Sequence, residues 1–269
     1  MIYKLPKPHP IIPQPKPERL PKRKAMTLIA GFLCSDGILI CADREESDGY
    51  ARRAVHKITS FNLKNSNYVI AGAGRSSILS NAIPRIEMAL RKAEECGDDL
   101  LETHRSIIGN SLQLIHEELI WSSKDPEASE RFINLIIAAS FETVRGEVVT
   151  ALYGTDKDIV SADFYVFKGI GSDLAHYFAD KLFVPSPNDR IWSIILATFI
   201  FREVRESIEG VGLGTEMVFL SGRKRGLRHE IGYEAIHDLE DGIISVRDAL
   251  STLWNNRVKL PVWLTEMKD

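Results

Sequence analysis

Three residues near the start of the chain have types and spacing suited to nucleophilic catalysis. Thr27, Asp43 and Lys57 supply a hydroxyl, a carboxylate and an ammonium group. The apolar run LIAGFL after Thr27 turns at Ser35-Asp36-Gly37 and returns as ILICA into Asp43. This pattern is typical of a β-hairpin with a tight Asp-Gly turn, and it predicts that Thr27 and Asp43 lie at the same end of two paired strands.

Lys57 lies 14 residues beyond Asp43, in the stretch RRAVHKI. We interpret that stretch as a third short strand running back beside the hairpin, which would bring all three groups into one site. Such a trio suits a threonine nucleophile whose base is its own α-amino group, provided that chain cleavage makes Thr27 the first residue. An α-amine titrates at about pH 7.7 to 8.0 and so is partly neutral at physiological pH. Lys57 would favour the alkoxide-like hydroxyl, and Asp43 would orient Lys57 and balance its charge.

The order of Thr27, Gly37, Asp43 and Lys57 resembles the amino end of mature proteasome β-type subunits and of the related bacterial peptidase subunit that works with an ATPase unfoldase. These proteins are N-terminal-nucleophile (Ntn) hydrolases. The resemblance implies that the threonine attacks, that the aspartate and lysine support it, and that a glycine amide after the next strand donates to the oxyanion.

Two junctions extend this resemblance. Ala71-Gly72 matches the pair whose glycine amide forms the oxyanion hole, and Gly171-Ser172 matches a pair whose serine supports the threonine amine. Each pair also has a purely structural interpretation. Gly72 would then serve to permit a strand-to-helix bend, and Ser172 would serve as the N-cap of a helix. The family also uses an aspartate in a later loop, and the corresponding segment GVGLGTEMVFL contains none.

Composition narrows the class of protein. The chain has 269 residues, of which 44% are hydrophobic and 26% charged, as in one large soluble domain or two small ones. Residues 1–25 hold seven Lys or Arg and one Glu, which leaves 27 basic and 36 acidic residues beyond them. The acidic body argues against nucleic-acid binding. Three cysteines without metal-ligand spacing favour the reducing cytoplasm, and no apolar run is long enough for a bilayer.

Residues 1–26 form the first predicted segment, because residues 1–25 carry seven of the twelve prolines. We expect a disordered basic arm that is a propeptide or a docking arm for an acidic partner. Two other interpretations are translation from Met26 and a tail of no consequence. The remaining residues, 27–269, are predicted to form one domain with a variable extension from about residue 222.

The order of apolar patterns in this domain predicts an α+β fold. A hairpin covering 58–74 leads into two amphipathic helices at 76–93 and 100–121, and three β-rich runs at 132–142, 146–155 and 162–171 predict a second sheet. A strand at 214–221 is expected in that second sheet, and one more short helix is expected after Leu239. The resemblance adds the assignment to a four-layer α-β-β-α sandwich, the Ntn hydrolase fold.

The sequence therefore favours a threonine-type peptide hydrolase with Thr27, Asp43, Lys57 and Ser172 as catalytic residues and Gly72 in the oxyanion hole. The resemblance implies a homo-oligomeric, proteasome-like ring in the cytoplasm, peptide or unfolded protein as substrate, and no cofactor or metal, and it allows an ATPase unfoldase as partner. No nucleic acid or membrane is expected as partner. Two alternatives stay open, a noncatalytic ring subunit and a non-peptide amidase.

Overall fold

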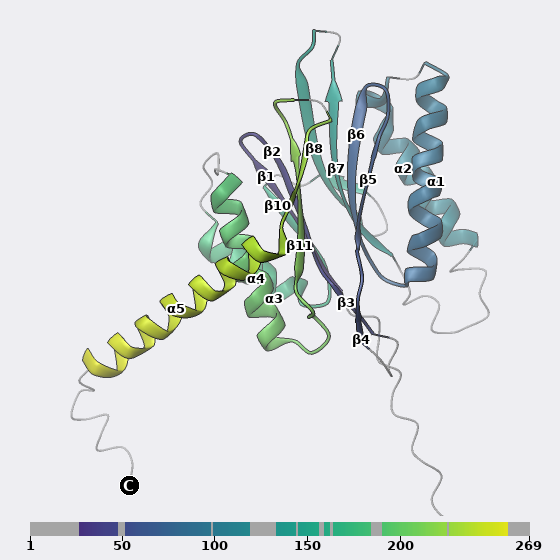
Figure 1. The fold of residues 1–269 in the computed structure, drawn as a ribbon. Coiled ribbons are helices and arrows are strands. Elements are labelled where there is room, and N and C mark those ends of the chain that lie inside the picture. The colour runs from purple at the N-terminus through teal and green to yellow at the C-terminus, as the bar shows by residue number, and fades with distance from the viewer. Residues whose placement is uncertain are drawn as a thin grey trace, which may run out of the picture.

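The computed structural model describes residues 27–47, 52–97, 99–118, 133–143, 145–155, 159–161, 164–183, 190–224 and 226–257. The predicted basic arm, residues 1–26, lies outside these residues, so its role stays a prediction. Figure 1 shows two antiparallel sheets facing each other, with helices on either side.

The first sheet has the strand order β10-β1-β2-β11-β12. Its strands are β1 (Leu28–Cys34), β2 (Gly37–Asp43), β10 (Tyr165–Gly169), β11 (Thr215–Ser221) and β12 (Arg228–Ile231). As predicted, β1 and β2 form a hairpin, in which Cys34 pairs with Gly37 across the two-residue turn. This register places the start of β1 beside the end of β2.

The second sheet has the strand order β5-β6-β7-β8-β9. Its strands are β5 (Ile58–Asn62), β6 (Ser66–Ala73), β7 (Asn134–Glu142), β8 (Val148–Thr155) and β9 (Ile159–Ser161). Between β2 and β5 in the sequence lie β3 (Glu45–Ser47) and β4 (Arg52–Ala54), which among the described strands pair only with each other. The chain thus crosses from the first sheet to the second just before β5.

Three hydrophobic clusters hold these elements together. One lies between the facing sheets and includes Ile40 and Ile136. A second packs α1 (Ser76–Glu95) and α2 (Leu100–His116) on the second sheet, and a third packs α3 (Ser172–Leu182) and α4 (Arg190–Ser207) on the first. Because both faces of β2 and β6 are covered, these strands are buried along their whole length and show no polar alternation.

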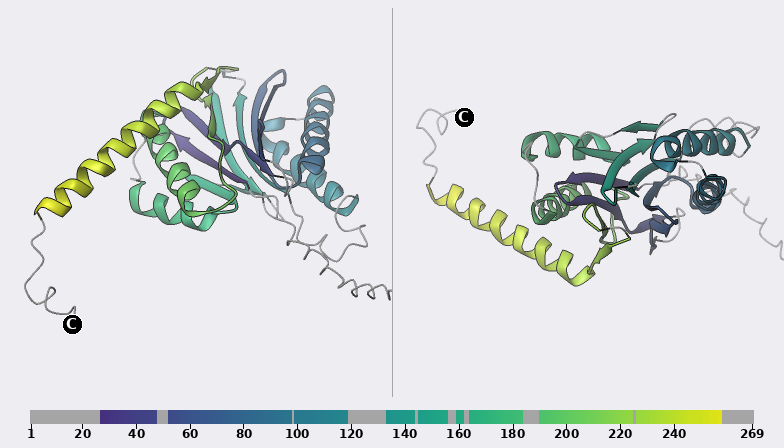
Figure 2. Two further views of the ribbon diagram at one scale, coloured as in Figure 1. Left: turned by 60° about the horizontal axis from the view of Figure 1, so that its bottom comes forward. Right: turned by 90° about the horizontal axis from the view of Figure 1, so that it is seen from above.

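The last helix, α5 (Tyr233–Arg257), is longer than the short helix predicted after Leu239. It begins near β11, where Ile236 is buried in the cluster beneath α4, and it then extends away from the sheets (Figure 2). Arg205 of α4 forms an ion pair with Glu240, which fixes the first half of α5 on the body.

The prediction of a four-layer α-β-β-α sandwich over residues 27–269 is wrong. The described residues form a mixed α/β fold with mostly antiparallel sheets, in which the β3-β4 ribbon and the projecting α5 belong to no such layer. The resemblance offered no residues beyond about Ser221 and so gave no information on α5.

Three strand assignments are also corrected. β10 and β11 were expected in the second sheet, but they pair with β1 and β2 of the first. The stretch before Lys57 does not run back beside the hairpin, because Arg52–Ala54 pairs with Glu45–Ser47 instead. An apolar run indicates that a strand is buried but not which strand it pairs with. The sequence therefore did not indicate which of the two sheets β10 and β11 join.

Gly169 provides a test of how tightly β10 closes on the start of β1. Its φ is +94°, and a Cβ added there would lie 1.8 Å from the Thr27 carbonyl oxygen. We therefore expect Gly169→Ala to lower the free energy of unfolding by more than the roughly 1–2 kcal/mol of left-handed strain alone. Denaturant unfolding measures this change.

The matched control is Gly242→Ala, since Gly242 lies in α5 with nothing within 4 Å of an added Cβ. A helical Gly→Ala change is expected to stabilise the chain by about 0.5–1 kcal/mol. Equal effects of the two substitutions would contradict the close approach at Gly169.

Candidate active site

Thr27 lies immediately before β1 and is buried, with 7% of its surface exposed. Its carbonyl oxygen accepts a hydrogen bond of 2.9 Å from the Ile170 amide, just after β10. The next amide, that of Leu28, donates to Asp43 Oδ1 at 2.8 Å. The peptide group that follows Thr27 is therefore held by the first sheet on both its carbonyl and its amide side.

Asp43 is the last residue of β2 and pairs with Thr215 of β11. Its carboxylate is almost fully buried, and its Oδ2 atom accepts a hydrogen bond of 3.1 Å from the Glu45 amide. Together with the Leu28 amide, this gives the carboxylate two backbone donors that fix its orientation. A buried carboxylate with these partners is a fixed negative charge beside Thr27.

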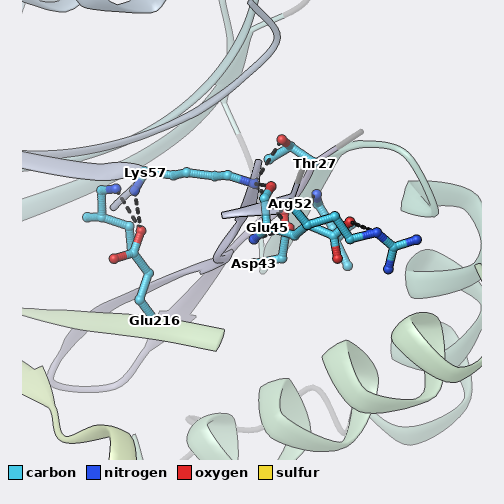
Figure 3. A network of polar contacts seen from close by, with 8 residues as sticks. Thr27, Asp43, Glu45, Arg52, Lys57 and Glu216 are labelled. Carbon is cyan, nitrogen blue, oxygen red and sulfur yellow. Dashed lines mark hydrogen bonds and ion pairs between the residues drawn. The ribbon is translucent and has the colours of Figure 1, made fainter. Parts of the chain in front are cut away.

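Lys57 reaches this point from the segment just before β5, in the second sheet (Figure 3). Its Nζ atom donates to Thr27 Oγ1 at 3.0 Å and to Asp43 Oδ1 and Oδ2 at 3.1 and 3.0 Å. The Glu45 carbonyl also accepts from Nζ. The structure thus brings together the hydroxyl, the carboxylate and the ammonium group that the sequence singled out.

Burial sets the electrostatics of this pair. It raises the pKa of Asp43 to about 6, against the opposing effect of the Lys57 ammonium and the two backbone amides. Burial also lowers the pKa of Lys57, while the charges of Asp43 and Glu216 act in the opposite direction. The protein therefore holds an ion pair in a place where neither charge would be stable alone.

Ser172 is the first residue of α3, and no hydrogen bond joins it to Thr27 in the described part of the chain. The interpretation of Ser172 as an N-cap is wrong, because Gly171 occupies the cap position with a φ of 78°. Ser172 lies two residues after Ile170, whose amide donates to the Thr27 carbonyl, so it is close in sequence to a residue that contacts Thr27. Its catalytic role stays a prediction.

Gly72 lies inside β6 rather than at a strand-to-helix bend. Its amide donates to the Lys57 carbonyl at 3.2 Å. The same amide would have to turn from that carbonyl to serve an oxyanion, so the predicted oxyanion role stays untested. What the contact does in this structure is to tie the backbone of Lys57 to β6.

Two glutamates complete the site and were missed in the sequence. Glu45 is buried, and its carboxylate pairs with Arg52 Nε at 3.3 Å while its carbonyl holds Lys57. Glu216 of β11 accepts hydrogen bonds from the backbone amides of Lys57 and Ile58. The only available signal for Glu216 was an acidic residue within the apolar strand TEMVFLS.

The described residues contain no group of His, Cys, Asp and Glu side chains that could hold a metal ion. Among the helices that the structure describes, none is long and apolar enough to cross a membrane. The arrangement instead offers a hydroxyl whose oxygen faces a buried cation. Such an oxygen suits addition to a carbonyl group.

A comparison with solved structures shows that this fold is similar to that of Anbu proteins. Anbu from Yersinia bercovieri, described as an ancestral beta-subunit, has a TM-score of 0.67 and 13% identity over 87% of this chain and 99% of that chain. A Gly-1 mutant of Anbu from Hyphomicrobium sp. strain MC1 has a TM-score of 0.66 and 14% identity over 87% and 99%. A helical assembly of the Anbu complex from Pseudomonas aeruginosa gives a TM-score of 0.64 and 13% identity over 87% and 98%.

No family model and no curated protein sequence matches the chain. The resemblance to proteasome β-type subunits is therefore corrected, because these structural neighbours are Anbu proteins. At 13–14% identity the likeness shows a shared fold and nothing about activity. The spacing of Thr27, Asp43 and Lys57 involves only the β1-β2 hairpin and the segment before β5. It cannot distinguish one family from another among proteins that share this fold.

Lys57→Met tests the ion pair. It removes the ammonium and leaves the Asp43 carboxylate buried without its partner, which should lower the free energy of unfolding by about 3–5 kcal/mol at pH 8. Without Lys57 the pKa of Asp43 rises further, so the native state favours the protonated acid. The loss should therefore shrink as the pH falls from 8 to 4.

Urea unfolding at both pH values measures this dependence. Arg91→Met is the control, because Arg91 forms only a half-exposed i,i+4 pair with Glu87 and its loss should cost at most about 0.5 kcal/mol. A Lys57→Met loss that is independent of pH would argue against the pairing with Asp43.

Proposed function

We propose that this chain is a threonine-type peptide hydrolase whose nucleophile is the hydroxyl of Thr27. The observation that carries the proposal is the 3.0 Å contact between Lys57 Nζ and Thr27 Oγ1, with the lysine held by Asp43. The buried ammonium favours negative charge on Oγ1 as the hydroxyl loses its proton. Thr27 must be the first residue of the active form, which requires removal of residues 1–26.

The identity of the base follows from what Lys57 contacts. Its Nζ atom faces two carboxylate oxygens, a carbonyl oxygen and a hydroxyl oxygen, all of which can accept its protons. The Asp43 carboxylate favours the ammonium form of Lys57, so we assign this lysine the role of a hydrogen-bond donor to Thr27 rather than that of the base. The free α-amine of Thr27 is the remaining candidate base.

The reaction then proceeds in two halves. The α-amine takes the hydroxyl proton as Oγ1 adds to the peptide carbonyl, and it returns that proton to the departing amine as the C–N bond breaks. The result is an ester between Thr27 and the acyl fragment. A water molecule then adds to the ester by the same proton route, which releases the acid and restores the hydroxyl.

The setting of this activity is part of the proposal. A structural neighbour from Pseudomonas aeruginosa is a helical assembly, and large apolar side chains are exposed on α1 and α2, including Met88 and Leu114. We infer that copies of this chain assemble into a homo-oligomer that acts on peptides or unfolded proteins in the cytoplasm. An ATPase unfoldase remains a predicted partner of this assembly.

A noncatalytic subunit of such an assembly is the second candidate. The occupied Gly72 amide favours it, because an oxyanion hole needs a free donor and this amide contacts the Lys57 carbonyl. The two candidates differ in what happens at Thr27. Only the hydrolase requires the hydroxyl and a free amino end.

Thr27→Ala should abolish hydrolysis of fluorogenic peptides, because no other hydroxyl is held against Lys57 in the described residues. The intact mass of the active wild-type protein should correspond to a chain that starts at Thr27. Sedimentation should show the same oligomer for both proteins.

Thr59→Ala is the matched control, since Thr59 is exposed on β5 two residues beyond Lys57. It should keep wild-type activity. Full activity from a protein that retains residues 1–26, or from Thr27→Ala, would overturn the proposal.

The raised pKa of Asp43 predicts a second acid limb in the pH profile. As the pH falls, kcat/KM should decline about tenfold per unit once the α-amine protonates, near an ordinary pKa of about 7.7–8.0. Below a pH of about 6, Asp43 also protonates and Lys57 loses its counter-charge, so the decline should steepen to about a hundredfold per unit.

This steepening should not come from unfolding. The pKa of Asp43 is raised from 3.8 to about 6 on folding, so the stability due to this group is complete below 3.8 and is lost as the pH rises through about 6. Circular dichroism at each pH checks that the protein stays folded. A constant slope down to pH 5 would contradict the coupling between Asp43 and activity.

A further inference from the structure

Glu216 connects the two sheets at the site. It lies in β11 of the first sheet, directly after Thr215, which pairs with Asp43. Its side chain is turned toward the segment that carries Lys57, as Figure 3 shows, and only 13% of it is exposed. A largely buried carboxylate within an apolar strand calls for a structural or functional reason.

The contacts of Glu216 are mainly with backbone. Its Oε1 atom accepts hydrogen bonds from the amides of Lys57 and Ile58, the latter at 3.0 Å. Its Oε2 atom lies 2.9 Å from His56 Nδ1, on a side chain that is 80% exposed. One carboxylate thus binds three consecutive residues around Lys57.

Within the described residues β5 is an edge strand of its sheet, so the amides of Ile58 and of Lys57 just before it have no strand partner on that side. An edge leaves a row of donors that must be satisfied by other groups. Glu216 supplies the acceptor, while on the other side the Gly72 amide donates to the Lys57 carbonyl. The backbone at Lys57 is therefore held from both sheets at once.

Such fixation matters because the lysine side chain is a flexible four-carbon stem. Its Nζ atom can sit between Thr27 and Asp43 only if the backbone from which it starts is fixed. A displacement of about 1 Å at a reacting group can lower a rate by about a hundredfold. Holding the backbone at Lys57 is thus a direct way to set the position of Nζ.

We propose that Glu216 is a positioning residue for Lys57, acting through its hydrogen bonds to the amides of Lys57 and Ile58. The inference rests on the proposed hydrolase, since the position of Nζ matters to activity only if Thr27 is the nucleophile. Glu216 is absent from the spacing pattern of Thr27, Asp43 and Lys57. It comes from GVGLGTEMVFL, the segment without a supporting aspartate, and it acts on the lysine from the side of β11.

Two variants of the full chain separate geometry from charge. Glu216→Gln loses the negative charge and keeps an oxygen that can accept from both amides, whereas Glu216→Ala loses both. We expect Glu216→Ala to lower kcat by about 10- to 100-fold with KM within about threefold, because Nζ is misplaced in the transition state. Glu216→Gln should keep kcat within about threefold of wild type.

Hydrogen exchange at the amides of residues 57 and 58 gives a readout that does not depend on catalysis. Exchange should be at least about tenfold faster in Glu216→Ala and near wild type in Glu216→Gln. Glu230→Ala, which removes an exposed glutamate of the neighbouring strand β12, is the control and should change neither kcat nor exchange.

The outcomes are distinct. A wild-type kcat for Glu216→Ala despite faster exchange would overturn the positioning role, as would a Gln variant that loses as much kcat as the Ala variant while its amides stay protected. If the wild type hydrolyses no peptide, the proposed function fails. The role of Glu216 in holding the backbone at Lys57 is then judged by exchange alone, and unchanged exchange in Glu216→Ala would overturn it.

Discussion

The ion pair between Lys57 and Asp43 is the interaction on which the site depends, because its two partners come from different sheets. Asp43 ends β2 of the first sheet, and Lys57 precedes β5 of the second. Either charge alone would be strongly unfavourable in this buried place. The ion pair therefore requires the end of β2 and the start of β5 to lie side by side. The β3-β4 ribbon makes the crossing, and Glu216 and Gly72 fix its end.

Local rules explain which parts of this arrangement were predictable. The two-residue turn at Ser35-Asp36 sets the register of the β1-β2 hairpin, and the register places Thr27 beside Asp43. The pairing of β10 and β11 was not predictable, because strands buried on both faces show the same apolar run whichever sheet they join. Glu216 was missed for a related reason. Its partner Lys57 lies 159 residues away, and a single acidic residue in a strand carries no spacing signal.

The resemblance implied roles for two residues besides Thr27, Asp43 and Lys57. It pointed to Gly72 and Ser172, yet the Gly72 amide contacts the Lys57 carbonyl and Ser172 makes no hydrogen bond to Thr27 within the described residues. The neighbouring Anbu structures share the fold at 13–14% identity, and a shared fold does not carry an activity with it. The case for catalysis therefore rests on the burial, distances and charges around Thr27.

As the proposed nucleophile, Thr27 must act with both its hydroxyl and a free α-amino group. A peptidyl epoxyketone tests both groups at once, since the hydroxyl adds to the ketone and the amine opens the epoxide to close a morpholine ring without loss of any atom. Intact mass spectrometry after incubation should show the chain from Thr27 plus one whole inhibitor, with the adduct localised to Thr27 by fragmentation. An unmodified Thr27 in a protein that still hydrolyses peptides would contradict this mechanism.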